Sequence, residues 1–409
     1  MMRKRIVITG IGVLSPIGSG RHEFWDALVS GKIGTSEITA FDTSIFKVNR
    51  GGEIKNFKPE DYYSSSHFKK AGRTTQLAVA AAKMAYQDAG LEHAGYHPEN
   101  IGVCIGTTMG NTGILESATD AYLEKEAGLV SDALISHFPN SYISGAVGEE
   151  LNLEGPCLTI PTACAAGNYA ITYGRDLIED GDVEIALVGG SDGLSRACYT
   201  TFHRLGAIAP EICQPFDKDR KGMMVSEGSA VIVLEERDRA LARGATIYAE
   251  LLGCGLSCDA HHPTAPHPKG LGAISAMEKT LLDAGVAKES ISYISAHGTG
   301  TKANDTIESI AIREVFGEAA DRIPVSSIKS MLGHTMGAAS AIEAVTCALA
   351  IHNNLIPPTM NFNEHDSDCI KNVVPNKSIQ QEVRYTLSNS FAFGGNISTI
   401  LMGAVKNAG

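Results

Sequence analysis

Short runs of apolar residues recur along the chain and alternate with longer segments in which apolar residues return every three or four positions. The short runs predict β-strands at residues 5–10, 101–107, 183–190, 230–236, 291–298 and 398–405. The segments 74–90 and 271–285 have the helical period, and each ends on a glycine, which commonly stops a helix. This alternation predicts an α/β layered fold.

Two places along the chain repeat one local plan, in which a strand is followed by a reactive side chain and a small-residue helix. The first contains Cys164, after the apolar Leu158–Ile160, and the second contains His334. The repetition predicts two similar units, residues 1–250 and 251–409, whose helix starts face each other.

The composition fits an ordinary globular enzyme. The chain has 409 residues, 44% hydrophobic and 20% charged, and no apolar run long enough to span a membrane. The net charge of -12 argues against binding to nucleic acid or to an anionic membrane. The nine cysteines are odd in number and scattered, which indicates a reducing, cytoplasmic location rather than a disulfide framework.

Cys164 has the surroundings of a nucleophile. Its neighbours in TACAAG have little side-chain bulk, so another molecule's thioester can approach the sulfur. A helix start offers free backbone N–H groups and a positive dipole end, which would lower the pKa of the thiol and serve an oxyanion hole. A structural buried cysteine is the alternative.

Two histidines are the expected partners of this cysteine. His297 follows a strand in a Gly/Thr turn, and His334 stands at the second helix start. Near a helix N-terminus an imidazole stays neutral, because the dipole opposes the cation, and a neutral ring can donate one N–H to a developing oxyanion. This pattern favours enolate chemistry over protease-like proton shuttling.

Two other motifs are weaker. The run GIGVLS at 10–15 lacks the third glycine of a dinucleotide fingerprint, so we interpret it as a tight turn. The run CDAHHPTAPH contains Cys258, His261, His262 and His267, but has no paired Cys-x-x-Cys, and a solvated loop is favoured over a zinc site.

Four ordered motifs, TACAAG, HGTGTKAND, KSMLGH and NSFAFGG, resemble those of the β-ketoacyl-[acyl carrier protein] synthases, especially the elongating type II enzymes and the type II polyketide ketosynthases. The resemblance runs over essentially the whole chain. It implies the thiolase fold, with duplicated α/β halves in a five-layered α-β-α-β-α arrangement, normally as a dimer.

By this resemblance Cys164 is the acyl-accepting nucleophile, and His297 and His334 bind the malonyl thioester carbonyl. Lys329 resembles the family's active-site lysine. Glu308 and Asp305 resemble the acidic residues that organise this lysine and the nearby loop.

The resemblance also implies the substrate contacts. Phe393, with Phe391 in the same motif, resembles the gate, and its N–H would join that of Cys164 in the oxyanion hole. Thr299 and Thr301 match threonines that bind the phosphopantetheine arm, although turn formation also explains them. Met109 stands where the acyl-pocket wall is expected.

A buried glutamate in an apolar helix, Glu343, needs a partner. In the family this glutamate and the residues matching Ser388 and Asn389 surround a structural monovalent cation. Here the fourth position is Ser295, where the family often has asparagine, so the cation is left open.

The implied reaction is a decarboxylative Claisen condensation of a Cys-bound acyl group with malonyl-acyl carrier protein. It needs no redox cofactor or catalytic metal, since substrates arrive on phosphopantetheine. Lys69, Lys70 and Arg73 are the candidate docking patch for the acidic carrier protein, with an ordinary solvated helix start as the alternative.

Several alternatives remain. Ala392 and the following GGNI depart from fatty-acid elongation enzymes and favour a polyketide or polyene pathway over housekeeping elongation. The chain also fits a subunit that works only as a heterodimer with a chain-length-factor homologue. A thiolase would need a second cysteine near the C-terminus, and Cys369 lies outside NSFAFGG. The initiating synthases use Cys-His-Asn, and the second histidine, His334, argues against them.

Overall fold

The computed structural model describes residues 3–64, 66–124 and 132–405, and it contains the same strand arrangement twice. In the first unit the strands lie in the order β6-β5-β7-β8-β1, and in the second in the order β11-β10-β14-β15-β9. In each unit the first three pair in parallel and the last two pairings are antiparallel. The topology therefore repeats strand by strand, as the sequence predicts.

The strands of the first sheet are nearly all fully buried, as expected for a sheet covered on both faces. Their bounds are β1 Ile6–Ser15, β5 Ile101–Gly106, β6 Cys157–Ile160, β7 Ile185–Asp192 and β8 Gly228–Glu236. Those of the second sheet are β9 Ala249–Cys258, β10 Tyr293–Ser295, β11 Val325–Ser326, β14 Tyr385–Phe391 and β15 Asn396–Gly403.

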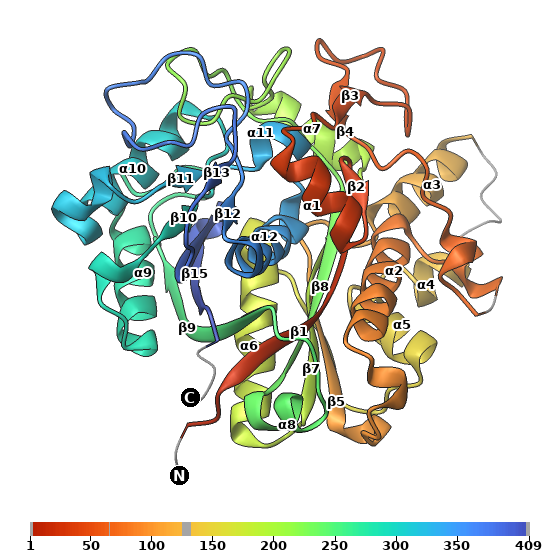
Figure 1. The fold of residues 1–409 in the computed structure, drawn as a ribbon. Helices are drawn as coiled ribbons and strands as arrows, with labels where there is room; N and C mark the ends of the chain where they lie inside the picture. The colour runs from red at the N-terminus through yellow and green to blue at the C-terminus, as the bar shows by residue number, and fades with distance from the viewer. Residues whose placement is uncertain (1–2, 65, 125–131, 406–409) are drawn as a thin grey trace.

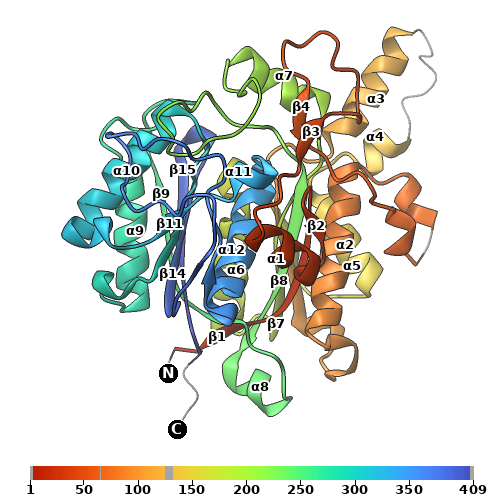
Figure 2. The ribbon, with the colours of Figure 1, turned by 45° about the horizontal axis from the view of Figure 1, so that its top comes forward.

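Helices form three layers around the two sheets, which gives the α-β-α-β-α arrangement (Figure 1). Helices α2 (Arg73–Asp88) and α5 (Ser141–Leu151) cover the outer face of the first sheet. Helices α9 (Leu271–Ala284) and α10 (Lys302–Phe316) lie outside the second. Between the sheets lie α6 (Ala166–Asp180) and α12 (Ala339–Asn353), as the turned view in Figure 2 also shows. The predicted thiolase fold is confirmed.

The two sheets are joined by a short antiparallel pairing of Ile6–Ile8 in β1 with Ala249–Leu251 in β9. The predicted boundary between residues 250 and 251 falls inside β9, the first strand of the second unit. The division of the chain at this point stays a prediction.

The tight turn expected at GIGVLS is wrong, because residues 10–15 continue β1 past a register shift between Ile8 and Gly10. Gly12 lies under α2, where a Cβ would come within 1.9 Å of the Ala81 carbonyl oxygen. The glycines of this run therefore serve close helix–sheet packing. Strands β9 and β14 have no counterpart among the predicted strands, and β10 is shorter than predicted.

The two buried helices begin in the same unusual way. The 3₁₀ turn η5 (Ala163–Ala165) precedes α6, and η8 (Met336–Ala338) precedes α12. Each turn starts on a non-glycine residue in the left-handed region, Ala163 at φ 52° and Met336 at φ 53°. Such residues are uncommon and often occur at functional sites.

The remaining elements lie around this frame. The helices are α1 Arg21–Val29, α3 Thr112–Leu123, α4 Asp132–Ser136, α7 Arg196–Arg204, α8 Arg237–Ala242 and α11 Lys329–Leu332. The short strands are β2 Gly18–Ser19, β3 Thr35–Glu37, β4 Arg50–Gly52, β12 Leu355–Ile356 and β13 Ile379–Gln380. In the described ranges, every helix is too short or too polar to cross a membrane.

Candidate active site

Three reactive side chains from distant parts of the chain meet between the two units. Nε2 of His334 lies 3.2 Å from Sγ of Cys164. The rings of His297 and His334 have their centroids 5.4 Å apart, nearly perpendicular to each other. All three side chains are buried, and all three line one cavity.

Each of these residues sits just after a strand or a short helix. Cys164 is the second residue of η5, which follows β6. His297 follows β10 in a turn whose Gly298 and Gly300 have positive φ, and His334 follows α11 and Gly333, at φ 78°. The duplicated topology brings the ends of these elements to the same edge of the molecule.

Burial dominates the state of the Cys164 thiol. It raises the pKa of Cys164 to about 12, although the Lys329 ammonium and the backbone N–H groups of Phe393 and Cys164 lower it in part. The expectation that the helix start would produce a low-pKa thiol is therefore wrong. The resting residue is a neutral thiol beside His334.

Both imidazoles are neutral, as the sequence predicts, but the main cause is different. Burial, followed by the Lys329 ammonium, holds the pKa of His297 and that of His334 well below the usual range. Nζ of Lys329 lies 3.4 Å from Nδ1 of His297. Because an ammonium only donates, this contact places the His297 proton on Nε2.

Lys329 has a partner that the sequence-based predictions did not name. Lys329 forms a buried ion pair with Glu343, from α12, rather than with Glu308 or Asp305. This pair supplies the partner that Glu343 requires in its apolar helix. Burial raises the pKa of Glu343 to about 7 against the opposing effect of Lys329.

Glu308 and Asp305 hold the loop that carries His297. Glu308 accepts the backbone N–H groups of His297 and Gly298, each at 2.8 Å. Asp305 accepts the N–H of Gly300 at 3.2 Å and that of Phe216 at 2.8 Å. Their predicted role in the loop agrees with these bonds. Arg220, absent from the sequence-based predictions, is buried with its Nε 3.6 Å from Asp305.

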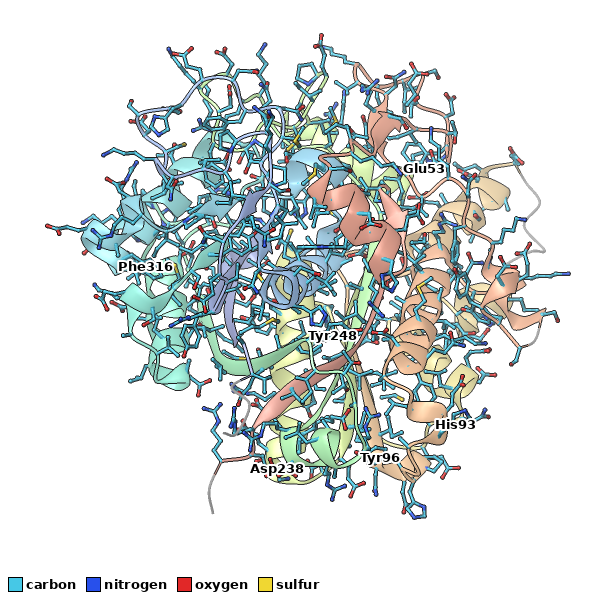
Figure 3. All side chains as sticks on the ribbon, in the orientation of Figure 1. Glu53, His93, Tyr96, Asp238, Tyr248 and Phe316 are labelled. Atoms are coloured by element: carbon cyan, nitrogen blue, oxygen red, sulfur yellow. The ribbon has the colours of Figure 1, made fainter. Side chains whose placement is uncertain are left out.

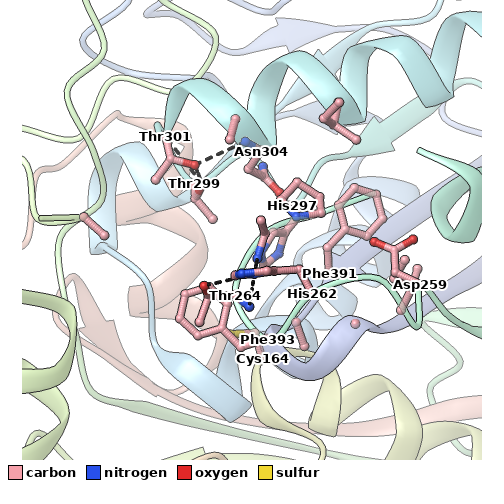
Figure 4. A pocket seen from close by; sticks show the side chains of 18 of the residues that line it. Cys164, Asp259, His262, Thr264, His297, Thr299, Thr301, Asn304, Phe391 and Phe393 are labelled. Atoms are coloured by element: carbon pink, nitrogen blue, oxygen red, sulfur yellow. Dashed lines mark hydrogen bonds between the residues drawn. The ribbon is translucent and has the colours of Figure 1, made fainter. Parts of the chain in front are cut away.

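The cavity above the sulfur has a volume of roughly 270 Å³. Figure 4 shows Cys164, His297, Phe391 and Phe393 around it, with Thr299 and Thr301 farther along the same space. The two threonine hydroxyls are 2.9 Å apart, and Thr301 also caps α10. Both readings of these threonines, turn formation and a lining for the substrate arm, are compatible with this position.

The backbone N–H groups of Phe393 and Cys164 lower the pKa of the Cys164 thiol, as donors near the sulfur do. This is the pair predicted for an oxyanion hole. Phe393 reaches this position through a turn in which Gly394 (φ 81°) and Gly395 (φ 82°) are left-handed, and its ring packs on that of Phe202, with centroids 5.5 Å apart.

Two of the predicted contact residues have partners within the chain. Met109 is half-buried in an apolar cluster with Phe202 and Phe393, behind the residues that line the cavity. Arg73 does not belong to a free docking patch, because its guanidinium binds the buried Glu227 at 2.8 and 3.1 Å. Lys69 and Lys70 are exposed, and their docking role stays a prediction.

The cation-binding residues fit only in part. Among the described residues, Ser295, Ser388 and Glu343 each have a buried oxygen without a hydrogen-bond partner, and oxygen atoms are the ligands that hard cations prefer. Asn389 instead binds Glu308 at 3.3 Å and accepts from Thr399 at 3.2 Å. The monovalent cation stays a prediction supported by three of its four residues.

The loop interpreted as solvated covers the cavity. His262, Pro263 and Thr264 line it, and Asp259 ties the loop to the Phe393 turn through the bond from its N–H to the Gly395 carbonyl, at 2.9 Å. Apart from the number of histidines in this loop, nothing in the sequence indicated that the loop covers the cavity. Across the described residues, no group of His, Cys, Asp or Glu is arranged to hold a metal ion. Cys369 is buried in the second unit's core, away from the cavity lining.

Comparison with known proteins shows the family to which this chain belongs. Residues 3–240 match the N-terminal domain of the β-ketoacyl synthases, and residues 248–363 match the C-terminal domain. The 3-oxoacyl-[acyl-carrier-protein] synthase 2 of Coxiella burnetii is 37% identical over 412 residues, covering 99% of this chain and 100% of that protein.

Two solved structures are similar along their whole length. The ishigamide ketosynthase/chain length factor has a TM-score of 0.96 and 43% identity, covering 99% of this chain and 100% of that one. A type II PKS acyl-carrier protein in complex with its ketosynthase bound to the hexaketide gives a TM-score of 0.92 and 32% identity, with coverage of 99% and 100%.

Proposed function

This chain belongs to the β-ketoacyl synthase family, and we propose that it makes 3-oxoacyl-[acyl carrier protein] by decarboxylative condensation in a polyketide-type pathway. The observation that carries the proposal is the meeting of Cys164, His297 and His334 at one cavity, beside the N–H of Phe393.

In the first step the acyl group moves to the enzyme. Sγ of Cys164 attacks the thioester carbon of an acyl carrier protein, and the thiol proton passes to Nε2 of His334, at 3.2 Å. The N–H groups of Cys164 and Phe393 stabilise the tetrahedral oxyanion. When the pantetheine sulfur leaves, it takes the proton from His334, and acyl-Cys164 remains.

In the second step malonyl-acyl carrier protein loses carbon dioxide. Nε2–H of His297, fixed by Lys329, and Nε2–H of His334 donate to the thioester oxygen as the bond to the carboxylate breaks. Nδ1 of His334 has no hydrogen-bond partner within the described chain, so the ring can carry its proton on either nitrogen and serve both steps.

In the third step the enolate carbon attacks the carbonyl of acyl-Cys164. A carbon–carbon bond forms, the carbon–sulfur bond breaks, and the 3-oxoacyl product stays on its carrier. Cys164 leaves as a thiolate and takes a proton from water, because its buried thiol has a pKa of about 12. The steps balance without a redox cofactor or a catalytic metal.

Three further assignments complete the proposal. Thr299 and Thr301 line the path of the phosphopantetheine arm, and Lys69 and Lys70 contribute to carrier-protein docking. The nine free cysteines support a cytoplasmic location. The protein works as a dimer, either with a second copy or with a ketosynthase homologue.

The polyketide assignment is supported by the likeness to a ketosynthase of a type II PKS, at a TM-score of 0.92 and 32% identity. Ala392 between Phe391 and Phe393 supports it, since a residue with a Cβ restricts the gating turn more than the glycine usual in fatty-acid enzymes. Housekeeping elongation is the alternative.

Intact-mass spectrometry tests the reaction. The purified protein is mixed with a panel of acyl carrier proteins bearing saturated, unsaturated or 3-oxo chains, with Cys164→Ala as the control. We expect one acyl increment on the wild-type protein and a 3-oxoacyl product when malonyl-acyl carrier protein is added. An unmodified Cys164 across the whole panel, alone and co-expressed with a ketosynthase homologue, contradicts the proposal. Faster loading of saturated chains favours the housekeeping alternative.

A further inference from the structure

One buried carboxylate near the active site has no part in the steps above. Asp192, the last residue of β7, is 1% exposed, and the ion pairs of the described residues include none with it. Its Oδ1 accepts from Oγ1 of Thr107 at 2.8 Å and from N of Met109 at 2.9 Å. Its Oδ2 accepts from N of Thr108 at 2.7 Å and from N of Gly337 at 2.6 Å. Four donors therefore stabilise a charge that burial alone would disfavour.

These donors come from both halves of the molecule. Residues 107–109 form the loop after β5, which carries Met109 into the apolar cluster around Phe202 and Phe393. Gly337 belongs to η8, three residues after His334. One carboxylate thus links the apolar cluster behind the cavity to the segment that sets the position of His334.

The duplicated turns show what kind of site the carboxylate fills. Cys164 is the second residue of η5, and Gly337 is the second residue of η8. The N–H of Cys164 faces the sulfur and the place of the substrate oxyanion, whereas the N–H of Gly337 faces Asp192. A Cβ on residue 337 would lie 2.6 Å from N of Thr108 and 2.7 Å from Oδ2 of Asp192, so the carboxylate also explains the glycine.

We propose that Asp192 is a positioning residue for the condensation reaction. It accepts the N–H of Gly337, the second unit's counterpart of the Cys164 N–H, and so fixes His334 and the Met109 loop relative to Cys164. We call the N–H groups at these two equivalent turns, η5 and η8, the two anion cradles. The proposal rests on the function proposed above. It assigns the two anion cradles of the duplicated fold different tasks, one for the substrate and one for an internal anion.

The charge of Asp192 has a separate, measurable consequence. It raises the pKa of the Cys164 thiol, while Lys329, from α11, lowers it. The other titratable groups that face the sulfur, His297 and His334, are neutral, and Cys198 on α7 is a buried thiol with a raised pKa. Removal of the Asp192 charge therefore lowers the pKa of Cys164 and increases its thiolate fraction.

The test compares Asp192→Asn with Glu235→Gln in the full-length protein. Glu235 is equally buried and lies at the other end of the same sheet, since Ile185 pairs with Glu235 and Asp192 pairs with Gly228. Its partner Tyr96 is labelled in Figure 3 beside α8, at the end opposite α7 and α11. Glu235→Gln thus removes a buried carboxylate without touching the active site.

We expect opposite changes in two rates for Asp192→Asn. Condensation falls by about ten- to a hundredfold, since small displacements of catalytic groups have effects of this size. Alkylation of Cys164 by iodoacetamide at about pH 8 rises roughly threefold or more, because the thiolate is favoured. Glu235→Gln changes each rate by less than about twofold per folded molecule, although it costs stability.

Condensation by Asp192→Asn within about twofold of wild type overturns the proposal, as does a parallel fall of both rates with the folded fraction. If the wild-type protein accepts no acyl group, the proposed function fails instead, and the alkylation rates still report on Asp192. If Asp192→Asn does not fold, Thr107→Val removes one donor to Asp192, together with the acceptor of the Gly110 N–H, and keeps the charge. A few-fold loss of condensation, restored in Thr107→Ser, then supports the proposal, and an unchanged rate contradicts it.

Discussion

The starts of α6 and α12 are the same structure used in two ways. Both follow a strand of equivalent position, both begin with a left-handed residue, and they pack against each other where N of Asn168 donates to Oγ of Ser340 at 3.0 Å. The first presents the thiol and the N–H of Cys164, and the second presents an N–H to a carboxylate of the protein itself. Duplication supplied two anion-binding turns, and the side chains decide which one meets the substrate.

The surroundings of the two helices differ accordingly. Residues Ala339–Ile351 of α12 are all buried, whereas α6 leaves Tyr173 42% exposed and carries the charged Arg175 and Asp176. The fully enclosed α12 carries Glu343, and its buried ion pair fixes Lys329 and through it His297. The second unit thus holds the polar groups in place, and the first unit receives the acyl group.

The largest loss of condensation rate is expected from removal of the Cys164 thiol, which only the first turn carries. Cys164→Ala lowers condensation by at least about 10³-fold, because no nucleophile remains. Decarboxylation of malonyl-acyl carrier protein continues, since His297 and His334 are intact. Carbon dioxide release and product mass distinguish the two activities, and loss of both in a folded Cys164→Ala protein would contradict the division of roles between the units.

Removal of the imidazole next to the second turn comes next in size. His334→Ala lowers the decarboxylation rate by about 10²–10³-fold, the usual loss for one oxyanion donor. His352→Ala, an exposed residue near the C-terminal end of α12, which follows the second turn, is the control and keeps the wild-type rate. Equal rates in the two variants would remove His334 from the decarboxylation step.

The pH dependence of Cys164 alkylation shows whether burial or the helix start has the larger effect on the pKa of the thiol. With a pKa of about 12 the thiol is deprotonated only in small part, so its alkylation rate rises about tenfold per unit between about pH 7 and 10. The exposed Cys258, followed by peptide mass spectrometry, is the internal control. A plateau of the Cys164 rate near pH 7 would show that the helix start dominates.

The contact between the two turns is sensitive to one methyl group. In Gly167→Ala the new Cβ would lie 2.7 Å from N of Ala341 and 2.8 Å from Oγ of Ser340. We expect a loss of about 1–3 kcal/mol in unfolding free energy, as for other overpacked sites. Gly145→Ala in α5, where a Cβ meets nothing within 4 Å, is the control and is expected to be neutral or stabilising. Denaturant unfolding measures both.

The smallest effect concerns backbone strain at the left-handed residues. Ala163→Gly relieves a strain of about 1 kcal/mol and adds unfolded-state entropy of similar size, so the unfolding free energy changes by less than about 1 kcal/mol. Ala165, two residues later, has φ -86° and is not strained. Ala165→Gly is therefore expected to lower the unfolding free energy by about 0.5–1 kcal/mol. Equal losses in the two variants would mean that Ala163 is unstrained.

The comparison also separates the parts of the site that a sequence can reveal. Cys164, His297 and His334 stand in unusual Gly-rich or Ala-rich turns, and their residue types state their chemistry. Asp192, at a strand end, and Asp259, in a loop, have no such signal, because their carboxylates accept backbone N–H groups that come from other segments. The ion pair of Lys329 with Glu343 has no sequence signal for the same reason, since it joins two segments that only the fold brings together.

The sequence alone determined the alternation of strands and helices, the duplication, and the order of the reactive residues, because periodicity and residue type are local properties. The tertiary structure decided the protonation state of Cys164, the pairing of Lys329 with Glu343, and the filling of the second cradle by Asp192. These depend on burial and on contacts between distant segments, and desolvation inside a packed core exceeds the effects that a helix start exerts on its own.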